Sequence, residues 1–202
     1  MKYQNIVYQF KISLREISPL IWRRIQVPSR YSFWDLHVAI QDSMGWMDYH
    51  LHAFRIKKPH KSRVSHIGIP DDEFDDIQEL PGWTEYIADY FQVPGKTAEY
   101  EYDFGDGWIH DILFEGMLIK EKNVRYPLCL DGARACPPED CGGVRGYAEL
   151  LEILDDPSHE EHERMKLWLS GWYGNYDPEH FDCRSVRFDA PGRRWNRAFQ
   201  QG

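Results

Sequence analysis

Apolar and polar residues alternate near the start of the chain in a way that predicts two strands. Every second residue from position 8 to position 14 is apolar, so these side chains would share one face of an extended segment. A Ser-Pro pair at positions 18–19 interrupts the pattern, and residues 21–27 form a second run that ends at Pro28. We expect the two runs to pair as a hairpin. The apolar face of the first run carries Tyr8, Phe10, Ile12 and Leu14.

The next segment has the spacing of a capped helix followed by a third strand. Ser32 and Asp35 stand three residues apart, as in a capping box, and Gly45 is placed to end the helix in a left-handed conformation. Between them, apolar residues recur every three or four positions. Residues 50–56 alternate again. The order strand, strand, helix, strand resembles the opening of a β-grasp fold. The third strand would place on one face His50, His52, Phe54 and Ile56.

Residues 57–96 lack a clear period, and we interpret them as an insertion between an amino-terminal and a carboxy-terminal part of one domain, residues 1–202. A basic loop occupies residues 57–66, and an acidic loop occupies residues 71–79. The acidic run is most simply a solvated loop. Residues 83–91 predict a short helix before Pro94.

Two alternating runs, at residues 98–104 and 108–115, predict a second hairpin. Pairing across a three-residue turn would place Phe104 opposite Trp108 and Tyr102 opposite His110, all on one aromatic face. Gly107 would then adopt the left-handed conformation. A turn of two residues would instead pair aromatic with acidic side chains, so the three-residue turn is favoured.

The remaining sequence predicts helices beginning near Tyr147 and after Ser158, followed by a last strand at residues 186–188 and a basic tail at residues 193–201. The predicted fold class is therefore α+β: a mainly antiparallel sheet with a β-grasp-like start and C-terminal helices.

Composition limits the classes of protein that remain. The 202 residues are 42% hydrophobic and 28% charged, which is typical of a globular protein. No apolar run approaches the roughly 18 residues of a membrane span, and the first ten residues lack the apolar core of a signal peptide. We expect a cytoplasmic protein without a membrane partner, in which the four cysteines are reduced thiols.

The charge is distributed unevenly along the chain. Residues 1–66 carry a net charge of +7, residues 67–183 carry −20, and residues 184–202 carry +4. The simpler interpretation is that basic and acidic parts pack against each other. The alternative is a nucleic-acid surface on the basic segment. Its candidate residues are Arg15, Arg23, Arg24, Lys57, Lys58, Lys61 and Arg63.

A metal site is the main chemical hypothesis. Two histidines two positions apart on a strand would reach one ion from the same face, and nearby residues offer ligands that suit zinc or another divalent cation. A metal-bound water would then permit hydrolysis with Glu139 or Asp140 as general base. The sequence contains neither an HExxH motif nor a close CxxC pair, and a core position for His110 is the competing interpretation. The candidate ligands are His50, His52, Asp103, Asp106, His110, Cys136, Glu139, Asp140 and Cys141.

Two stretches, YDFGDGWIH at residues 102–110 and CPPEDCGGVRGY at residues 136–147, carry a resemblance to a known family. With the segments around His37 to Phe54 and Asp177 to Asp182, they resemble the plasmid pRi open-reading-frame-three-like family, which is found on plasmids and mobile elements. Some members bear a transposon-passenger, resolvase-type label. The resemblance implies no activity, cofactor or catalytic residue.

Three functions follow as hypotheses. The first is a non-catalytic binding or accessory module of mobile elements, with no cofactor predicted and with an unknown partner, either a protein or a nucleic acid. The second is a metal-dependent hydrolase or nuclease that uses the His/Asp/Glu/Cys cluster. The third is a DNA-contacting module that uses the basic segment.

Overall fold

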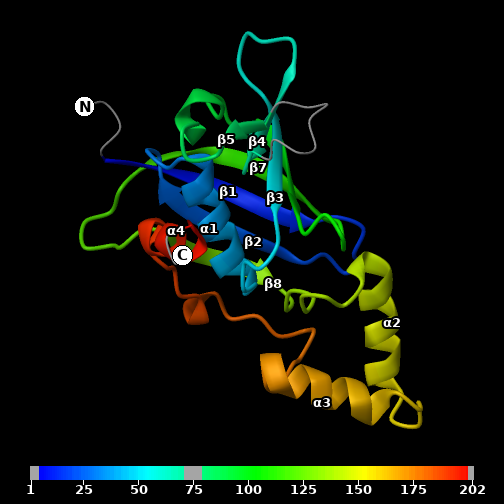
Figure 1. The fold of residues 1–202 in the computed structure, drawn as a ribbon. Helices are drawn as coiled ribbons and strands as arrows, with labels where there is room; N and C mark the ends of the chain where they lie inside the picture. The colour runs from blue at the N-terminus through cyan, green and yellow to red at the C-terminus, as the bar shows by residue number, and fades with distance from the viewer. Residues whose placement is uncertain (1–4, 71–78, 200–202) are drawn as a thin grey trace.

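The computed structural model describes residues 5–70 and 79–199, which form one sheet with helices packed on it (Figure 1). The strand order is β5-β4-β3-β6-β7-β1-β2-β8, and every pair except β4–β5 is antiparallel. The strands are β1 (Ile6–Leu14), β2 (Trp22–Pro28), β3 (His52–Lys57), β4 (Val64–Gly68), β5 (Glu79–Pro81), β6 (Thr97–Tyr102), β7 (Trp108–Ile119) and β8 (Leu128–Ala133). The helices are α1 (Phe33–Met44), α2 (Gly143–Asp155), α3 (His162–Tyr173) and α4 (Pro191–Phe199). The α+β fold class is therefore confirmed.

The β1–β2 hairpin and α1 form as their sequence pattern predicts. Ser32 accepts a hydrogen bond from the Asp35 backbone N–H, and the Asp35 carboxylate accepts one from Ser32 N–H at 2.9 Å. Gly45 ends the helix with φ of 95°. These capping hydrogen bonds involve residues within one helical turn, so the local sequence is enough to predict them.

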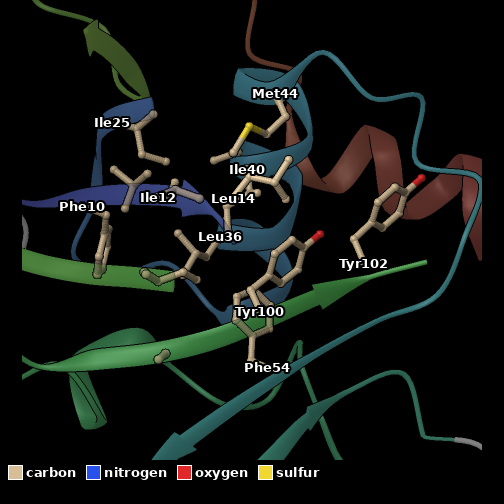
Figure 2. Packing of buried hydrophobic residues seen from close by; sticks show 14 of the residues in the cluster. Phe10, Ile12, Leu14, Ile25, Leu36, Ile40, Met44, Phe54, Tyr100 and Tyr102 are labelled. Carbon is tan, nitrogen blue, oxygen red and sulfur yellow. The ribbon is translucent and has the colours of Figure 1, made fainter. Parts of the chain in front are cut away.

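The core lies between the sheet and α1. Figure 2 shows Phe10, Ile12 and Leu14 of β1 facing Leu36 and Ile40 of α1. Aromatic rings from β3, β6 and β7 complete this layer, with Phe54 and Tyr100 ring centroids 4.7 Å apart. This packing holds the ends of β3, β6 and β7 in fixed positions, and these ends carry the candidate site.

The predicted register of the β6–β7 hairpin is wrong by two residues. Tyr102 pairs with Trp108 and Tyr100 pairs with His110, so the connecting loop has five residues, Asp103 to Gly107. The Asp103 carboxylate accepts hydrogen bonds from two backbone N–H groups within this loop, which stabilises the longer turn. The shift of two residues leaves the side chains that remain in the strands on their predicted faces, and Gly107 is left-handed as predicted, with φ of 67°. Phe104, which was predicted on the aromatic face, instead lies in the loop and is 49% exposed.

Segment 57–96 adds β4 and β5 to the edge of the sheet beside β3. The short helix predicted at residues 83–91 is only a single 3-10 turn at Ile87–Asp89. Except for Glu79, the predicted acidic loop at residues 71–79 lies outside the described residues.

The C-terminal region departs most from prediction. Residues 186–188 form no strand, and the segment predicted as a basic tail contains α4, which packs on α1 (Figure 1). Arg194 forms ion pairs with Asp42 and Asp48, and the Trp195 ring lies edge-on to Trp34 at 5.4 Å. Partners about 150 positions away in the sequence thus stabilise a short helix that would be marginal alone.

Candidate metal centre

Three loops meet at one end of the sheet, where α1 leads to β3, β6 to β7, and β8 to α2. The indole N–H of Trp46 donates a hydrogen bond of 2.9 Å to the Pro137 carbonyl, which joins the first loop to the third. Asp106 accepts a hydrogen bond of 3.1 Å from Gly142 N–H, which joins the second loop to the third. Side chains more than 30 positions apart in sequence are thereby brought to one place.

A cluster of one imidazole and two carboxylates lies at this meeting point. His50 Nε2 is 3.2 Å from Asp140 Oδ1 and 3.6 Å from Asp103 Oδ2, and the three ligand atoms lie within 4.8 Å of one another. The Nε2 atom is shielded from solvent and makes no hydrogen bond. The side chains of His50, Asp103 and Asp140 are 28%, 9% and 69% exposed, so the cluster is closed on the Asp103 side and open on the Asp140 side.

These distances fit a divalent cation. Ligand atoms bound tetrahedrally at 2.0–2.1 Å stand about 3.4 Å from each other, close to the two His50 separations. Two carboxylates and a neutral imidazole supply a charge of −2, which balances the ion. Asp103 Oδ1 accepts from Gly105 N–H at 3.0 Å and from Asp106 N–H at 3.3 Å, so its other oxygen is held toward His50.

His52, the other predicted histidine of this strand, points away from the cluster into the core. Its ring stacks on His37, with centroids 3.5 Å apart. β3 begins at His52, and the turn before it carries His50 out toward Asp103, whose N–H donates to the Leu51 carbonyl at 2.9 Å. The strand that the sequence extended to residue 50 is therefore shorter, and the two histidines separate.

His110 also lies in the core, on the aromatic face of β7. Its Nδ1 lies 3.1 Å from the Trp108 carbonyl and 3.3 Å from the Tyr100 carbonyl, so Nδ1 carries the proton and donates. Burial lowers the pKa of His110 to about 4. Neither His52 nor His110 joins the His50 cluster.

Glu139 has a different place from its neighbour Asp140. It is buried, and its carboxylate accepts hydrogen bonds from the Tyr102 hydroxyl and from Met47 N–H. The Tyr102 oxygen in turn accepts from Tyr49 N–H at 3.0 Å. Both carboxylate oxygens are engaged, so Glu139 holds the loops together and does not face the cluster as a base. No pattern in the sequence indicated that Tyr102 would be the central group of this network.

The cysteines lie outside the cluster. Cys136 is buried, and burial raises the pKa of its thiol. Burial, with a smaller contribution from Asp106, raises the pKa of the Cys141 thiol to about 12. Both are therefore protonated near neutral pH, the state that binds metal weakly. All four cysteines are free thiols.

The basic residues of the amino-terminal segment are mostly engaged. Arg15 pairs with Glu99 and Asp111, and Arg24 pairs with Glu115 at 2.8 Å. These carboxylates come from the acidic part of the chain, which favours internal packing over DNA contact.

Of the other basic candidates, Arg23 is buried and donates to the carbonyls of Ser43, Trp22 and Ala133. Lys58 lies 3.5 Å from Glu85. The exposed ones, around the connection between β3 and β4, are Lys57, Lys61 and Arg63.

Among residues 5–70 and 79–199, none of the helices combines the length and the apolarity that crossing a membrane requires.

The sequence matches the plasmid pRiA4b ORF-3-like protein family over residues 6–185. It is 35% identical over 171 residues to y4hQ, an uncharacterised protein of Sinorhizobium fredii, with 85% of this chain and 84% of the relative covered.

The crystal structure of MM3350, a protein of unknown function from Methanosarcina mazei Go1, is similar in fold and sequence. The TM-score is 0.83 at 44% identity, and the match covers 91% of this chain and 99% of that protein. Sequence and fold thus agree over most of the chain, and the protein belongs to the plasmid pRiA4b ORF-3-like family.

Proposed function

We propose that this protein is a non-catalytic binding module of mobile elements that holds a divalent cation, such as zinc or manganese, with His50, Asp103 and Asp140. The observation that supports this most directly is the solvent-shielded His50 Nε2, which faces two carboxylates at 3.2 and 3.6 Å and makes no hydrogen bond. Three protein ligands leave a position on the ion, where an oxygen of a protein or nucleic-acid partner would bind.

Two cavities border the cluster, one at His50 and the other at Asp140. A cavity of about 740 Å³ is lined by His50 together with the aromatic rings of Trp34, Trp46 and Phe199. A second, of about 650 Å³, is lined by Asp140 and by apolar residues of α2 and α3. Both volumes lie in the range of sites that bind small molecules or peptide side chains.

Metal-dependent hydrolysis is the second candidate, because an open coordination position is also the mark of catalytic zinc sites. Its predicted general base is less well supported. Both oxygens of Glu139 already accept hydrogen bonds, and Asp140 is itself a proposed ligand. The binding function therefore comes first.

The test is metal binding by untagged protein, measured by isothermal titration calorimetry with Zn²⁺ and Mn²⁺ after chelator treatment. We expect one ion per chain. His50→Gln and Asp140→Asn should each weaken binding at least about tenfold, the lower end of the effect of losing a metal-site interaction. His60→Gln, in the connection between β3 and β4, is the matched control and should bind as the wild type does.

Asp103→Asn is a poorer test because Asp103 also accepts two hydrogen bonds inside its own loop. Absence of stoichiometric binding in the folded wild type would overturn the proposal and leave His50 as an ion-pair partner of the two carboxylates. Hydrolysis of simple phosphodiesters or esters by the loaded wild type, lost in His50→Gln, would instead promote the second candidate.

A further inference from the structure

The helices α2 and α3 form an arm that extends away from the sheet (Figure 1). Residues of both helices line a groove. The groove has a volume of about 650 Å³. Its apolar lining comes from both helices and consists of Leu150, Ile153, Met165, Leu167 and Trp168.

The apolar surface continues along α3 beyond the groove. Met165, Trp168 and Trp172 follow one another at spacings of three and four, which places them along one stripe of the helix. Leu167, which lines the groove but lies off this stripe, is 75% exposed, and Trp172 is also exposed. Large apolar side chains of this kind, exposed next to a groove, are typical of surfaces that bind another protein.

The charged residues that line the groove are three carboxylates, Asp140, Glu149 and Glu161, and one arginine, Arg164. Residues 140–173 contain eight Asp and Glu against three Lys and Arg. All three basic residues already pair within the arm, Arg145 with Glu149 at 3.1 Å, Arg164 with Glu161, and Lys166 with Glu163 at 3.7 Å. An apolar stripe with acidic edges is complementary to a helix with one apolar face and basic flanks.

The chain itself contains one such helix, and it is engaged elsewhere. α4 packs on α1 with its aromatic residues against Trp34 and with Arg194 between Asp42 and Asp48. This contact shows within one molecule how an Arg- and Trp-bearing helix binds a surface that combines apolar rings with carboxylates. Because α4 is held there, it does not occupy the groove between α2 and α3.

We propose that the groove between α2 and α3 is a docking site for an amphipathic helix of a partner protein, whose apolar face enters the groove and whose Lys and Arg residues meet the acidic edges. The interaction is of the helix-in-groove kind, in which residues spaced by three and four positions act as anchors. This inference does not depend on a cation at His50, although Asp140 lies at both places.

The experiment uses fluorescence anisotropy with the full chain and three labelled peptides of about 18 residues, long enough to form a helix. The first is a Leu/Lys amphipathic helix, the second is its Leu/Glu counterpart, and the third has the Leu/Lys composition in scrambled order. We expect micromolar binding of the first, and at least about tenfold weaker binding of the other two. The titrations are made with a chelator present, so that the result is independent of metal.

Leu167→Lys is the test variant. The Leu167 side chain is 75% exposed, so we expect the variant to fold as the wild type does. Ile119→Lys, at the end of β7 and 82% exposed, makes the same chemical change elsewhere and is the matched control. Leu167→Lys should weaken binding of the Leu/Lys helix at least about tenfold, because it replaces an apolar lining residue of the groove with a charge of the same sign as the peptide. Ile119→Lys should leave its affinity unchanged.

Equal affinity of the two variants for the Leu/Lys helix, or equal binding of the scrambled peptide, would overturn the proposal. Sedimentation of the wild type supplies a second test. A dimer that dissociates on Leu167→Lys would assign the groove to a second copy of this chain and overturn the partner-helix proposal.

Discussion

The imidazole rings of His37 and His52 stack face to face, with centroids 3.5 Å apart and planes 7° apart. His37 lies with one ring nitrogen 2.9 Å from the Tyr100 hydroxyl and the other 2.8 Å from Asp48. His52 Nδ1 has no hydrogen-bond partner. Two stacked rings of this kind tolerate a neutral His52 far better than a charged one.

This stack predicts a loss of stability in mild acid. Burial, with a smaller contribution from His37, lowers the pKa of His52 well below its usual value of 6.5. The unfolded chain therefore takes up a proton at His52 before the folded chain does, and the free energy of unfolding falls as the pH drops below about 6.5. The slope is up to about 1.4 kcal/mol per pH unit for one group.

The variant His52→Gln isolates this effect in urea unfolding. Between about pH 7.5 and pH 5, its free energy of unfolding should change by up to about 2 kcal/mol less than that of the wild type. The exposed His60→Gln should keep the wild-type pH dependence. Identical pH dependence in His52→Gln and the wild type would contradict the prediction.

Tyr102→Phe should destabilise the three-loop end of the sheet. The change removes the hydroxyl that donates to buried Glu139 and accepts from Tyr49 N–H, so the fold is left with an under-satisfied buried carboxylate. We expect a loss of about 1–3 kcal/mol in the free energy of unfolding, measured with urea.

The matched control for this change is Tyr126→Phe, whose hydroxyl accepts a surface hydrogen bond from Glu121 N–H. Its loss should stay below about 0.5 kcal/mol. Similar losses in the two tyrosine variants would show that the Tyr102 hydroxyl has no special role.

Gly143→Ala should separate two of the loops that form the candidate site. Gly143 has φ of 68°, and an added Cβ would stand 2.4 Å from the Asp106 carbonyl oxygen, a backbone atom that cannot move aside alone. We expect a loss of more than about 2 kcal/mol, because backbone strain and overpacking act together.

Gly171→Ala, inside α3, has open space around the new methyl group and should instead stabilise the protein by up to about 1 kcal/mol. Thermal unfolding of the two variants measures the contrast. If Gly143→Ala left the stability unchanged, the two loops would not approach each other as closely as the structure has them.

Arg194→Gln should release α4 from α1. Arg194 is the cation between Asp42 and Asp48, so its loss removes the arginine that two largely buried carboxylates share. Because His37 still contacts Asp48 and the Asp189 N–H still donates to Asp42, we expect a loss of about 1–3 kcal/mol in the free energy of unfolding, together with faster proteolytic cleavage of the C-terminal segment.

Arg193→Gln is the control for this change, because Arg193 makes only a surface ion pair with Asp189. Its effect should stay below about 1 kcal/mol. Equal proteolytic rates for both variants would show that the aromatic contacts alone hold α4 in place.

Elements stabilised by neighbouring residues in the sequence were predicted correctly, and elements stabilised by distant residues were not. The caps of α1 at Ser32 and Gly45 depend on residues within one turn, and both predictions are confirmed. The helix α4 depends on Trp34, Asp42 and Asp48, which no local pattern connects with residues 191–199. A basic tail was therefore the expected result of local reasoning.

The candidate metal centre shows the same division. The sequence identified His50 and Asp140 as ligand types, but the choice between His50 and His52 depended on where β3 begins. That start depends on the β6–β7 loop, where Asp103 N–H bonds the Leu51 carbonyl. Long-range backbone pairing thus decided which histidine turns toward the carboxylates.

The two-residue periodicity of the β6–β7 hairpin has an evolutionary consequence. Side chains on a strand repeat their facing every two residues, so the hairpin can exchange a pair of residues between strand and loop while the rings that remain in the strands, such as Tyr100 and Tyr102, stay in the core. The loop that carries Asp103 and Asp106 can then lengthen or shorten in steps of two while the sheet keeps its packing. Evolution could therefore change the residues of the candidate site at this end of the molecule while the chain keeps its ability to fold.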